Sequence, residues 1–277
     1  MKNNLIKLLT NDKEVRFFIV DTTEALKQSN LKEMKTDFSK ELYAKVFTSC
    51  SLLRGFLTSE DQRLSVNVRF NLKGYSINCE IDGCGNIHCI FSARLMAYEG
   101  EFLDLISDGA TLSVTRGSWM GGMFTGTVEL NSESIESCLA DFYSKSEQLD
   151  TIFRTWVCNG KVRGCMVQAL PFANINNLIN VIDNINKNEK FISKVEWARL
   201  TNEIFSYATV IEEYSIQTEC NCSKEMFFGM LMSIDTVELK QSILMNKGEE
   251  LECGICGKKY LFNTNDLKSI VKIKEDG

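Results

Sequence analysis

Residues 64–83 read LSVNVRFNLKGYSINCEIDG, and apolar side chains occupy every second position on either side of Gly74. This alternation is typical of strands that bury one face, and the glycine marks the turn between two of them. Comparable strand patterns follow in residues 86–95, 110–117, 126–130, 151–157 and 164–171. This part of the chain is therefore expected to be built on half-buried strands.

Two amphipathic helices interrupt the strands. Residues 38–57 carry apolar side chains at helical spacing, and residues 133–147 do the same behind a serine cap at Ser132 or Ser134. Isolated helices among strands, without regular βα alternation, indicate an α+β fold rather than a doubly wound sheet. The only proline of the chain marks the end of this core, which we expect to span residues 1–171.

The segment 172–219 loses the strand alternation and gains helical spacing. Ser193 and Glu196 have the spacing of a capping box, so one helix is expected to begin there. The apolar stripes of such helices need a surface to lie against, and the simplest interpretation is that they belong permanently to the core. We therefore expect a helical linker between the core and the tail.

The tail, residues 220–277, contains two close pairs of cysteines. Cys220 and Cys222 form a C-x-C pair, and Cys253 and Cys256 form a C-x-x-C pair. Four thiolates can converge on one tetrahedral zinc ion, which prefers such soft ligands and is then left with no open position for a substrate water. We therefore predict a small zinc-binding domain and no catalytic residues, so the chain is not expected to be an enzyme.

Two interpretations of this zinc site stay open from the residues alone. A static zinc ribbon would simply fold a tail that buries too little surface to fold by itself. A redox switch would use the reactivity of metal-bound thiolates, because close pairs form disulfides once one sulfur is oxidised. Loss of zinc would then unfold the tail, since structural zinc contributes on the order of 10–16 kcal/mol to such modules.

Composition limits the partners and the location. The chain of 277 residues has a formal net charge of −6 and a pI near 5.1, without the basic surface that nucleic-acid binding usually needs. We see no signal peptide and no run approaching the ~20 apolar residues of a membrane span, so a cytoplasmic location without membrane contact is expected. In a reducing cytosol, clustered cysteines are more typical of metal or redox sites than of structural disulfides.

Several motifs together resemble one known family. CNCSKE at 220–225 and CGICGKKYLFNTNDL at 253–267 form one pair of motifs, FTGTVELNSESIESCLADFYSKSEQL at 124–149 ends in a Ser-Glu-Gln signature, and GCMVQALP stands at 164–171. In this order and spacing they cover much of the chain from about 105 to 270. They resemble the 33 kDa chaperonin family, the bacterial redox-regulated heat-shock holdases.

The resemblance implies an ATP-independent molecular chaperone that holds unfolded proteins during oxidative stress. In that family four cysteines bind zinc in the reduced, inactive protein, and oxidants convert the two pairs into disulfides. Carried over, Cys220 would pair with Cys222, and Cys253 with Cys256. The linker would then unfold and expose apolar surface, usually in a homodimeric active form. The sequence departs from the family at Asp150, where a proline commonly follows the signature.

Other interpretations of the cysteine motifs stay open beside this one. The C-x-x-C pair could serve a thiol-disulfide oxidoreductase, although no βαβ unit precedes it. The tail could also be a structural zinc-ribbon interaction module. A further possibility is a second metal site, formed by Cys79, Cys84, Cys89 and His88. The strand pattern instead predicts that Cys79 and Cys89 pack as small buried residues.

Overall fold

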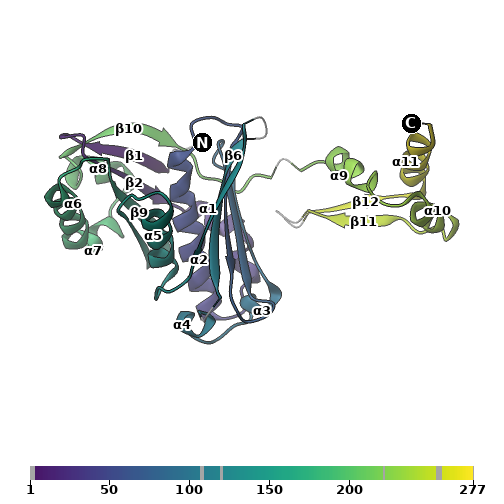
Figure 1. Ribbon diagram of the computed structural model, residues 1–277, viewed down its shortest axis with the longest axis horizontal. Helices are drawn as coiled ribbons and strands as arrows, with labels where there is room; N and C mark the ends of the chain where they lie inside the picture. Colours follow the sequence, from purple (N-terminus) through teal and green to yellow (C-terminus); the bar gives the residue numbers. More distant parts are fainter. Residues whose placement is uncertain (1–3, 107–108, 119–120, 221, 254–257, 277) are drawn as a thin grey trace. The chain divides into compact units, whose positions relative to one another are not determined.

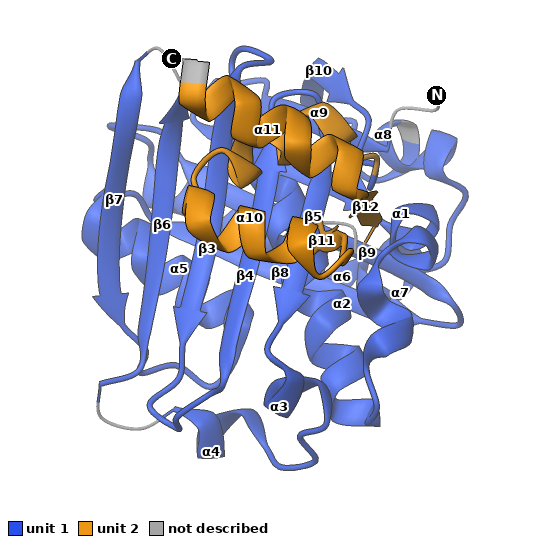
Figure 2. Cartoon of the chain, turned by 90° about the vertical axis from the view of Figure 1, so that its right-hand side faces the viewer, with its two compact units in different colours: residues 1–218 blue, residues 219–277 orange. Residues whose placement is uncertain are grey.

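The computed structural model of the chain is shown in Figure 1. It describes residues 4–106, 109–118, 121–220, 222–253 and 258–276. Contacts divide the chain into two compact units, Met1–Thr218 and Glu219–Gly277 (Figure 2). Among the helices that the structure describes, none combines the length and the apolar character that a membrane span requires.

The first sheet of unit 1, called sheet A here, is antiparallel with the strand order β10-β1-β2-β9-β8. Its strands are β1 (Leu5–Thr10), β2 (Val15–Asp21), β8 (Thr151–Cys158), β9 (Lys161–Ala169) and β10 (Ala208–Tyr214). The strand patterns predicted β8 and β9, and both are present. Strands β1 and β2 were missed. Strand β2 is buried on both faces and therefore shows no alternation.

The second sheet, called sheet B, is antiparallel with the order β5-β4-β3-β6-β7. Its strands are β3 (Gln62–Arg69), β4 (Ser76–Asp82), β5 (Ile87–Phe91), β6 (Thr111–Ser118) and β7 (Gly122–Glu129). Gly74 has a φ of +89° in the turn between β3 and β4, as its position in the sequence predicted. The alternation of apolar residues in the sequences of β3 and β4 matches their burial, because one face of this sheet is buried and the other is not.

Two long helices, α2 (Asp37–Leu52) and α5 (Ile135–Ser146), pack between the sheets, as the contacts of α2 with β2, β8 and β9 and with β4 and β5 show (Figure 1). Both were predicted. Of the two candidate caps, Ser134 caps α5 by accepting a hydrogen bond from the backbone of Ser137. Shorter helices complete the core: α1 (Thr23–Gln28), η1 (Asn30–Glu33), η2 (Leu53–Phe56), α3 (Ala93–Met96) and α4 (Phe102–Leu105).

The predicted linker belongs to unit 1 by its contacts. It covers the face of sheet A opposite the one that α2 covers. Its helices are α6 (Ile175–Lys187), α7 (Glu189–Ile192), η3 (Trp197–Arg199) and α8 (Leu200–Glu203). It also contains strand β10, which the helical pattern did not predict. The predicted capping box is wrong: Ser193 has a helical backbone conformation, and its hydroxyl donates to the Lys190 carbonyl, whereas a cap residue needs an extended backbone.

Unit 2 is a small α/β module with its own apolar core. It contains α9 (Lys224–Leu231), α10 (Thr236–Leu244), the antiparallel strands β11 (Glu249–Glu252) and β12 (Lys259–Phe262), and α11 (Thr264–Asp276). Buried aromatic and aliphatic side chains from its helices and from β12 form the core. Mixed sheets and helices are thus confirmed, while the functional division into core, linker and zinc-binding domain stays a prediction.

Candidate metal centre

Three of the four predicted zinc ligands converge in unit 2. The Sγ atoms of Cys220, Cys222 and Cys253 all lie within 4.8 Å of one another, and those of Cys220 and Cys253 are 3.8 Å apart. Two sulfurs bound to one tetrahedral zinc at ~2.3 Å would be about 3.8 Å apart. The spacing of this pair therefore fits two ligands of a single zinc ion.

The fourth predicted ligand, Cys256, lies outside the described residues. The described ligands nevertheless come from two distant segments of the chain, one before α9 and one after β11. Their approach is therefore a product of the tertiary fold and not of local sequence spacing. Within the part of the chain that the structure describes, this is the one group of three or more potential ligands close enough to hold a metal ion.

Local hydrogen bonds fix the two segments that carry the thiols. Ser223 caps α9 by accepting a hydrogen bond from the backbone of Met226, which sets the chain direction just after Cys222. The backbone N–H of Cys253 donates to the Lys258 carbonyl at 2.8 Å. This bond joins the residues on either side of 254–257 and closes the end of the hairpin. The thiols are thus carried by segments whose backbones are already constrained.

Tyr260 is a site residue that the sequence analysis did not single out. Its hydroxyl lies 2.7 Å from the backbone oxygen of Cys222 and 3.1 Å from Cys222 Sγ, and it can donate its hydrogen to either. A donor at this sulfur favours the thiolate, the form that binds a metal. The ring stacks on Phe227, with centroids 4.9 Å apart, which holds the hydroxyl in place. The aromatic position in the GKKYLF motif was the only signal available.

Lysines flank the thiols, but two of them have carboxylate partners. Lys224 Nζ lies 2.8 Å from Asp266, and the ammonium holds the pKa of that carboxyl below its ordinary value. Lys259 pairs with Glu250 at 2.6 Å. These ion pairs connect α9 to α11 and β12 to β11. They therefore brace the module and do not act chiefly as counter-charges to the sulfurs.

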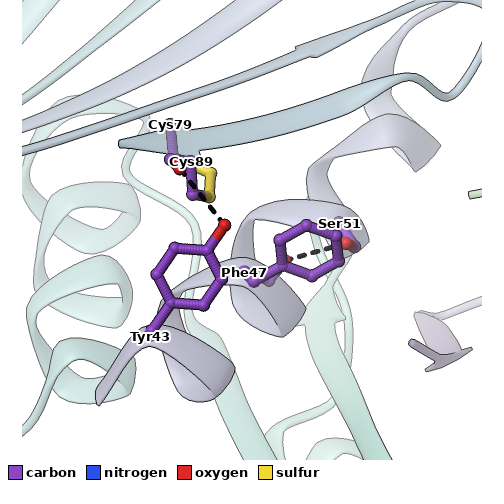
Figure 3. The surroundings of a disulfide bond; sticks show 5 residues. All are labelled: Tyr43, Phe47, Ser51, Cys79 and Cys89. Carbon is purple, nitrogen blue, oxygen red and sulfur yellow. Dashed lines mark hydrogen bonds between the residues drawn. A yellow bond between two sulfur atoms is a disulfide. The ribbon is translucent and has the colours of Figure 1, made fainter. Parts of the chain in front are cut away.

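The second metal site does not form. Cys79 and Cys89 face each other on β4 and β5 and are joined by a disulfide (Figure 3). His88 is adjacent to Cys89 in a strand, so its side chain lies on the opposite face of the sheet, while Cys84 is exposed in the turn. The prediction that Cys79 and Cys89 are buried strand residues is confirmed, whereas the disulfide between them was not predicted.

The other buried cysteines have environments that suppress reactivity. Burial raises the pKa of the Cys138 and Cys165 thiols to about 12 and also raises that of Cys50. Thiols in this state carry almost no thiolate near neutral pH, and the thiolate is the form that oxidants attack. These three residues therefore serve packing and not redox chemistry.

Cys253, the described member of the C-x-x-C pair, does not have the surroundings of an oxidoreductase cysteine. Cys253 directly follows strand β11 of a two-stranded antiparallel hairpin. Thiol-disulfide oxidoreductases place the reactive cysteine at a helix N-terminus, where the helix lowers the thiol pKa. The strand setting, together with the approach of Cys220, favours metal binding over disulfide exchange.

Comparisons with known proteins agree with this geometry. A family model described as Hsp33 protein matches residues 3–263. Curated relatives named 33 kDa chaperonin include one from Latilactobacillus sakei, 26% identical over 98% of this chain and 99% of that protein, and one from Listeria monocytogenes, 25% identical over 98% of both. The crystal structure of a 33 kDa chaperonin from Thermotoga maritima superposes with a TM-score of 0.80 over the whole of both chains at 20% identity, which shows the shared fold. This chain belongs to the Hsp33 family.

Proposed function

We propose that this chain is a redox-regulated, ATP-independent holdase. In the reduced protein, Cys220, Cys222, Cys253 and Cys256 bind zinc. Under oxidative stress the two pairs become disulfides, and the protein then binds unfolded clients. The observation that carries the proposal is the convergence of three of these sulfurs within 4.8 Å in a chain that belongs to a chaperone family.

The donor set fits zinc on chemical grounds. All three described ligands are thiols, which are soft donors, and the 3.8 Å separation of Cys220 Sγ and Cys253 Sγ matches a tetrahedral centre. When bound, zinc keeps the sulfurs as thiolates and cross-links the segment before α9 to the hairpin. Tyr260 orients Cys222 for this task through its hydroxyl. A unit this small depends on such a cross-link for much of its stability.

Oxidation breaks that cross-link. With hypochlorous acid as the oxidant, two thiolates of one pair give up two electrons to chlorine and form a sulfur–sulfur bond, and chloride and hydroxide are the other products. A disulfide sulfur is no longer an anionic ligand. The pairing Cys220 with Cys222 and Cys253 with Cys256 would therefore release zinc and leave unit 2 without the element that joins its two ends.

The face of sheet A under the linker would supply the apolar surface that the holdase needs. On one side of sheet A, strand β2 presents Phe17 and Ile19, and α6 covers them with Leu178, Val181 and Ile185. If the linker comes away, this apolar face becomes exposed, and large apolar patches are what bind unfolded chains. The proposal extends the expected linker, residues 172–219, to this role.

We further propose a location and partners for this chain. Unfolded proteins are the partners, and the oxidised form is a homodimer in the cytoplasm. The net charge of −6 supports a partner other than nucleic acid. A zinc module without a switch is the competing function, and it differs in one respect: oxidation would not create binding activity.

The test compares zinc and activity in the same samples. Reduced, zinc-loaded protein is treated with hypochlorous acid, zinc release is followed with a colorimetric chelator, and suppression of aggregation is assayed with a chemically unfolded client. We expect one zinc per chain to be released and holdase activity to appear with it. Cys220→Ser should lower the zinc content, whereas Cys84→Ser, an exposed thiol in unit 1, should leave it unchanged. Equal zinc loss from both variants, or equal activity before and after oxidation, would overturn the proposal.

A further inference from the structure

The disulfide of unit 1 lies where two strands approach most closely. Along β4 and β5, the backbone N–H of Asp82 donates to Asn86, and that of Ser92 donates to Ser76. Even-numbered residues of β4 therefore form the hydrogen-bonded pairs of this antiparallel ladder. Cys79 and Cys89 are directly opposite each other in the intervening class of pair, where side chains stand closest, and their Cα atoms are 4.0 Å apart.

The pair is also closed off from solvent by α2. Each cysteine is 1% exposed. Tyr43 of α2 extends its hydroxyl to the backbone oxygen of Cys89 at 3.2 Å, as Figure 3 shows. Register, burial and this hydrogen bond together keep the two sulfurs facing each other. No rearrangement of the sheet is needed to join or separate them.

The position of β5 gives the pair a way to react. β5 is the outermost strand of sheet B, with β4 as its one neighbour in that sheet; on its outer side Ile87, at the start of the strand, donates to the Gln217 carbonyl. Edge strands open locally at a lower free energy than central strands, so a small oxidant or reductant can reach Cys89 during such openings. The pair should consequently react more slowly than the thiols of unit 2, of which Cys220 and Cys222 are partly exposed.

We propose that Cys79 and Cys89 are a second redox couple of this chain, separate from the zinc ligands, which closes under oxidants and opens under dithiol reductants. With hypochlorous acid, one sulfur loses its proton while the strand is open, and the thiolate is then converted to a sulfenyl chloride, with release of hydroxide. The second thiol then displaces chloride and gives up its proton, so that the disulfide, chloride and a proton are formed. With a dithiol, the disulfide is reduced to two thiols while the reductant becomes a cyclic disulfide.

The closed couple would fasten the edge of sheet B. An unfastened edge strand exposes a row of backbone groups that pair readily with other extended chains. A covalent link between β5 and β4 prevents this strand from separating. The inference goes beyond the proposed function, because it concerns sheet B of unit 1 and holds whether or not the zinc thiols act as a switch.

Peptide mapping of the full-length protein tests the couple directly. The protein is reduced, exposed to hypochlorous acid, denatured with an alkylating agent present, and digested with a protease that cleaves after Glu80. Cys79 and Cys89 then lie on separate peptides unless a disulfide joins them. The Cys84→Ser variant is mapped in parallel, since it removes the one other cysteine between them.

We expect the linked peptides to rise at least about tenfold on oxidation and to disappear after dithiothreitol treatment of the folded protein. Amide exchange in β5 should slow on oxidation of the wild type and stay unchanged in Cys89→Val, which cannot form the link. Alkylation of both cysteines after oxidation would overturn the proposal. So would a link that survives dithiothreitol in the folded protein, because it would be a permanent bond and not a couple.

Discussion

The two faces of sheet A are covered in contrasting ways. Strand β2 sends Phe18 and Val20 to one face and Phe17 and Ile19 to the other, and all four side chains are buried. The first face is covered chiefly by α2, a helix of 16 residues that begins with a capping box at Thr36. The second is covered by the linker, whose longest helix has 13 residues and is followed by pieces of four, three and four residues.

The shorter helices of the linker make it the cover that we expect to come away. Helices shorter than about 12–15 residues are marginal without tertiary contacts, so α7, η3 and α8 keep their form only while they lie on the sheet. The linker stripe is also incomplete, because Ile175 and Ile179 are 54% and 46% exposed. We therefore propose that the α2 face of this sheet is a permanent core and that the linker face is a conditional one.

The largest expected effect comes from damaging the permanent core. Phe47 of α2 is fully buried, and Phe47→Ala should lower the free energy of unfolding of unit 1 by about 3–5 kcal/mol through the cavity it leaves. Chemical denaturation of the reduced protein measures this. The variant should unfold globally and show no selective loss of the linker. Selective opening of α6–α8 would break the distinction between the two faces.

The next effect comes from Arg163 of β9, which pairs with Asp21 of the neighbouring strand β2 and also hydrogen-bonds the linker. The Arg163 guanidinium is 2% exposed, lies 2.8 Å from Asp21 and donates to the Ile192 carbonyl at 2.7 Å. Arg163→Met should weaken linker docking by about 1–3 kcal/mol, because it leaves the carbonyl of the buried Ile192 without this donor. Hydrogen exchange of α7 in the reduced protein should speed up, and some holdase activity should appear without oxidation.

The matched control for this experiment is Lys161→Met on the same strand. Lys161 contacts the linker at Glu196 across 3.8 Å and donates to the Lys194 carbonyl at 3.0 Å, but both contacts are at the surface, where such interactions contribute less than about 1 kcal/mol. An equal effect from Lys161→Met and Arg163→Met would contradict the role given to the buried guanidinium.

A smaller effect is expected at the zinc site. Tyr260→Phe keeps the stacking on Phe227 and removes the hydroxyl that contacts Cys222. Outer hydrogen bonds of this kind typically change metal affinity by about 10- to 100-fold. Competition with a chelator should therefore show weaker zinc binding and a lower oxidant dose for activation, with the fold of unit 1 unchanged. Wild-type zinc affinity in Tyr260→Phe would remove this residue from the site.

The smallest effect sharpens the comparison within α6 itself. Ile185 is 2% exposed, and Ile185→Val should cost about 0.5–1.5 kcal/mol of linker docking. Ile179→Val on the exposed side of the same helix removes the same methylene and should cost almost nothing. Exchange rates of α6 amides in the two variants provide the measurement. Identical rates would show that the buried stripe does not hold the linker in place.

The sequence predicted most of the elements in which one face alone is buried, and also β9, which is buried on both faces. Sheet B and α5 were identified because alternation or helical spacing reveals a single apolar face. Strand β2 was missed because Phe17 to Val20 are buried in succession. Strand β10 was missed because its hydrogen-bonding partner, β1, lies far away in the sequence. The capping box at Ser193 failed because the fold, not the local sequence, sets the backbone at that residue.

The candidate site likewise contains residues that the sequence predicted and residues that it did not. The spacing of Cys220, Cys222 and Cys253 was enough to predict that they converge, since close pairs of cysteines are a signal in themselves. Tyr260 and the Cys79–Cys89 disulfide were not predictable in this way. A hydrogen bond from a strand to a distant sulfur, and a pairing between neighbouring strands, both depend on tertiary contacts and on register.

Hydrogen exchange of the full-length protein, reduced with zinc and again after hypochlorous acid, shows directly whether the linker face of sheet A opens while the α2 face stays closed. We predict that amides of α6, α7 and α8 lose protection on oxidation, while those of α2 and of β3, β4 and β6 keep it. Zinc release measured in the same samples should follow the same time course as the loss of protection. Loss of protection on both faces of sheet A together, or on neither while zinc is released, would show that oxidation does not open the linker face selectively.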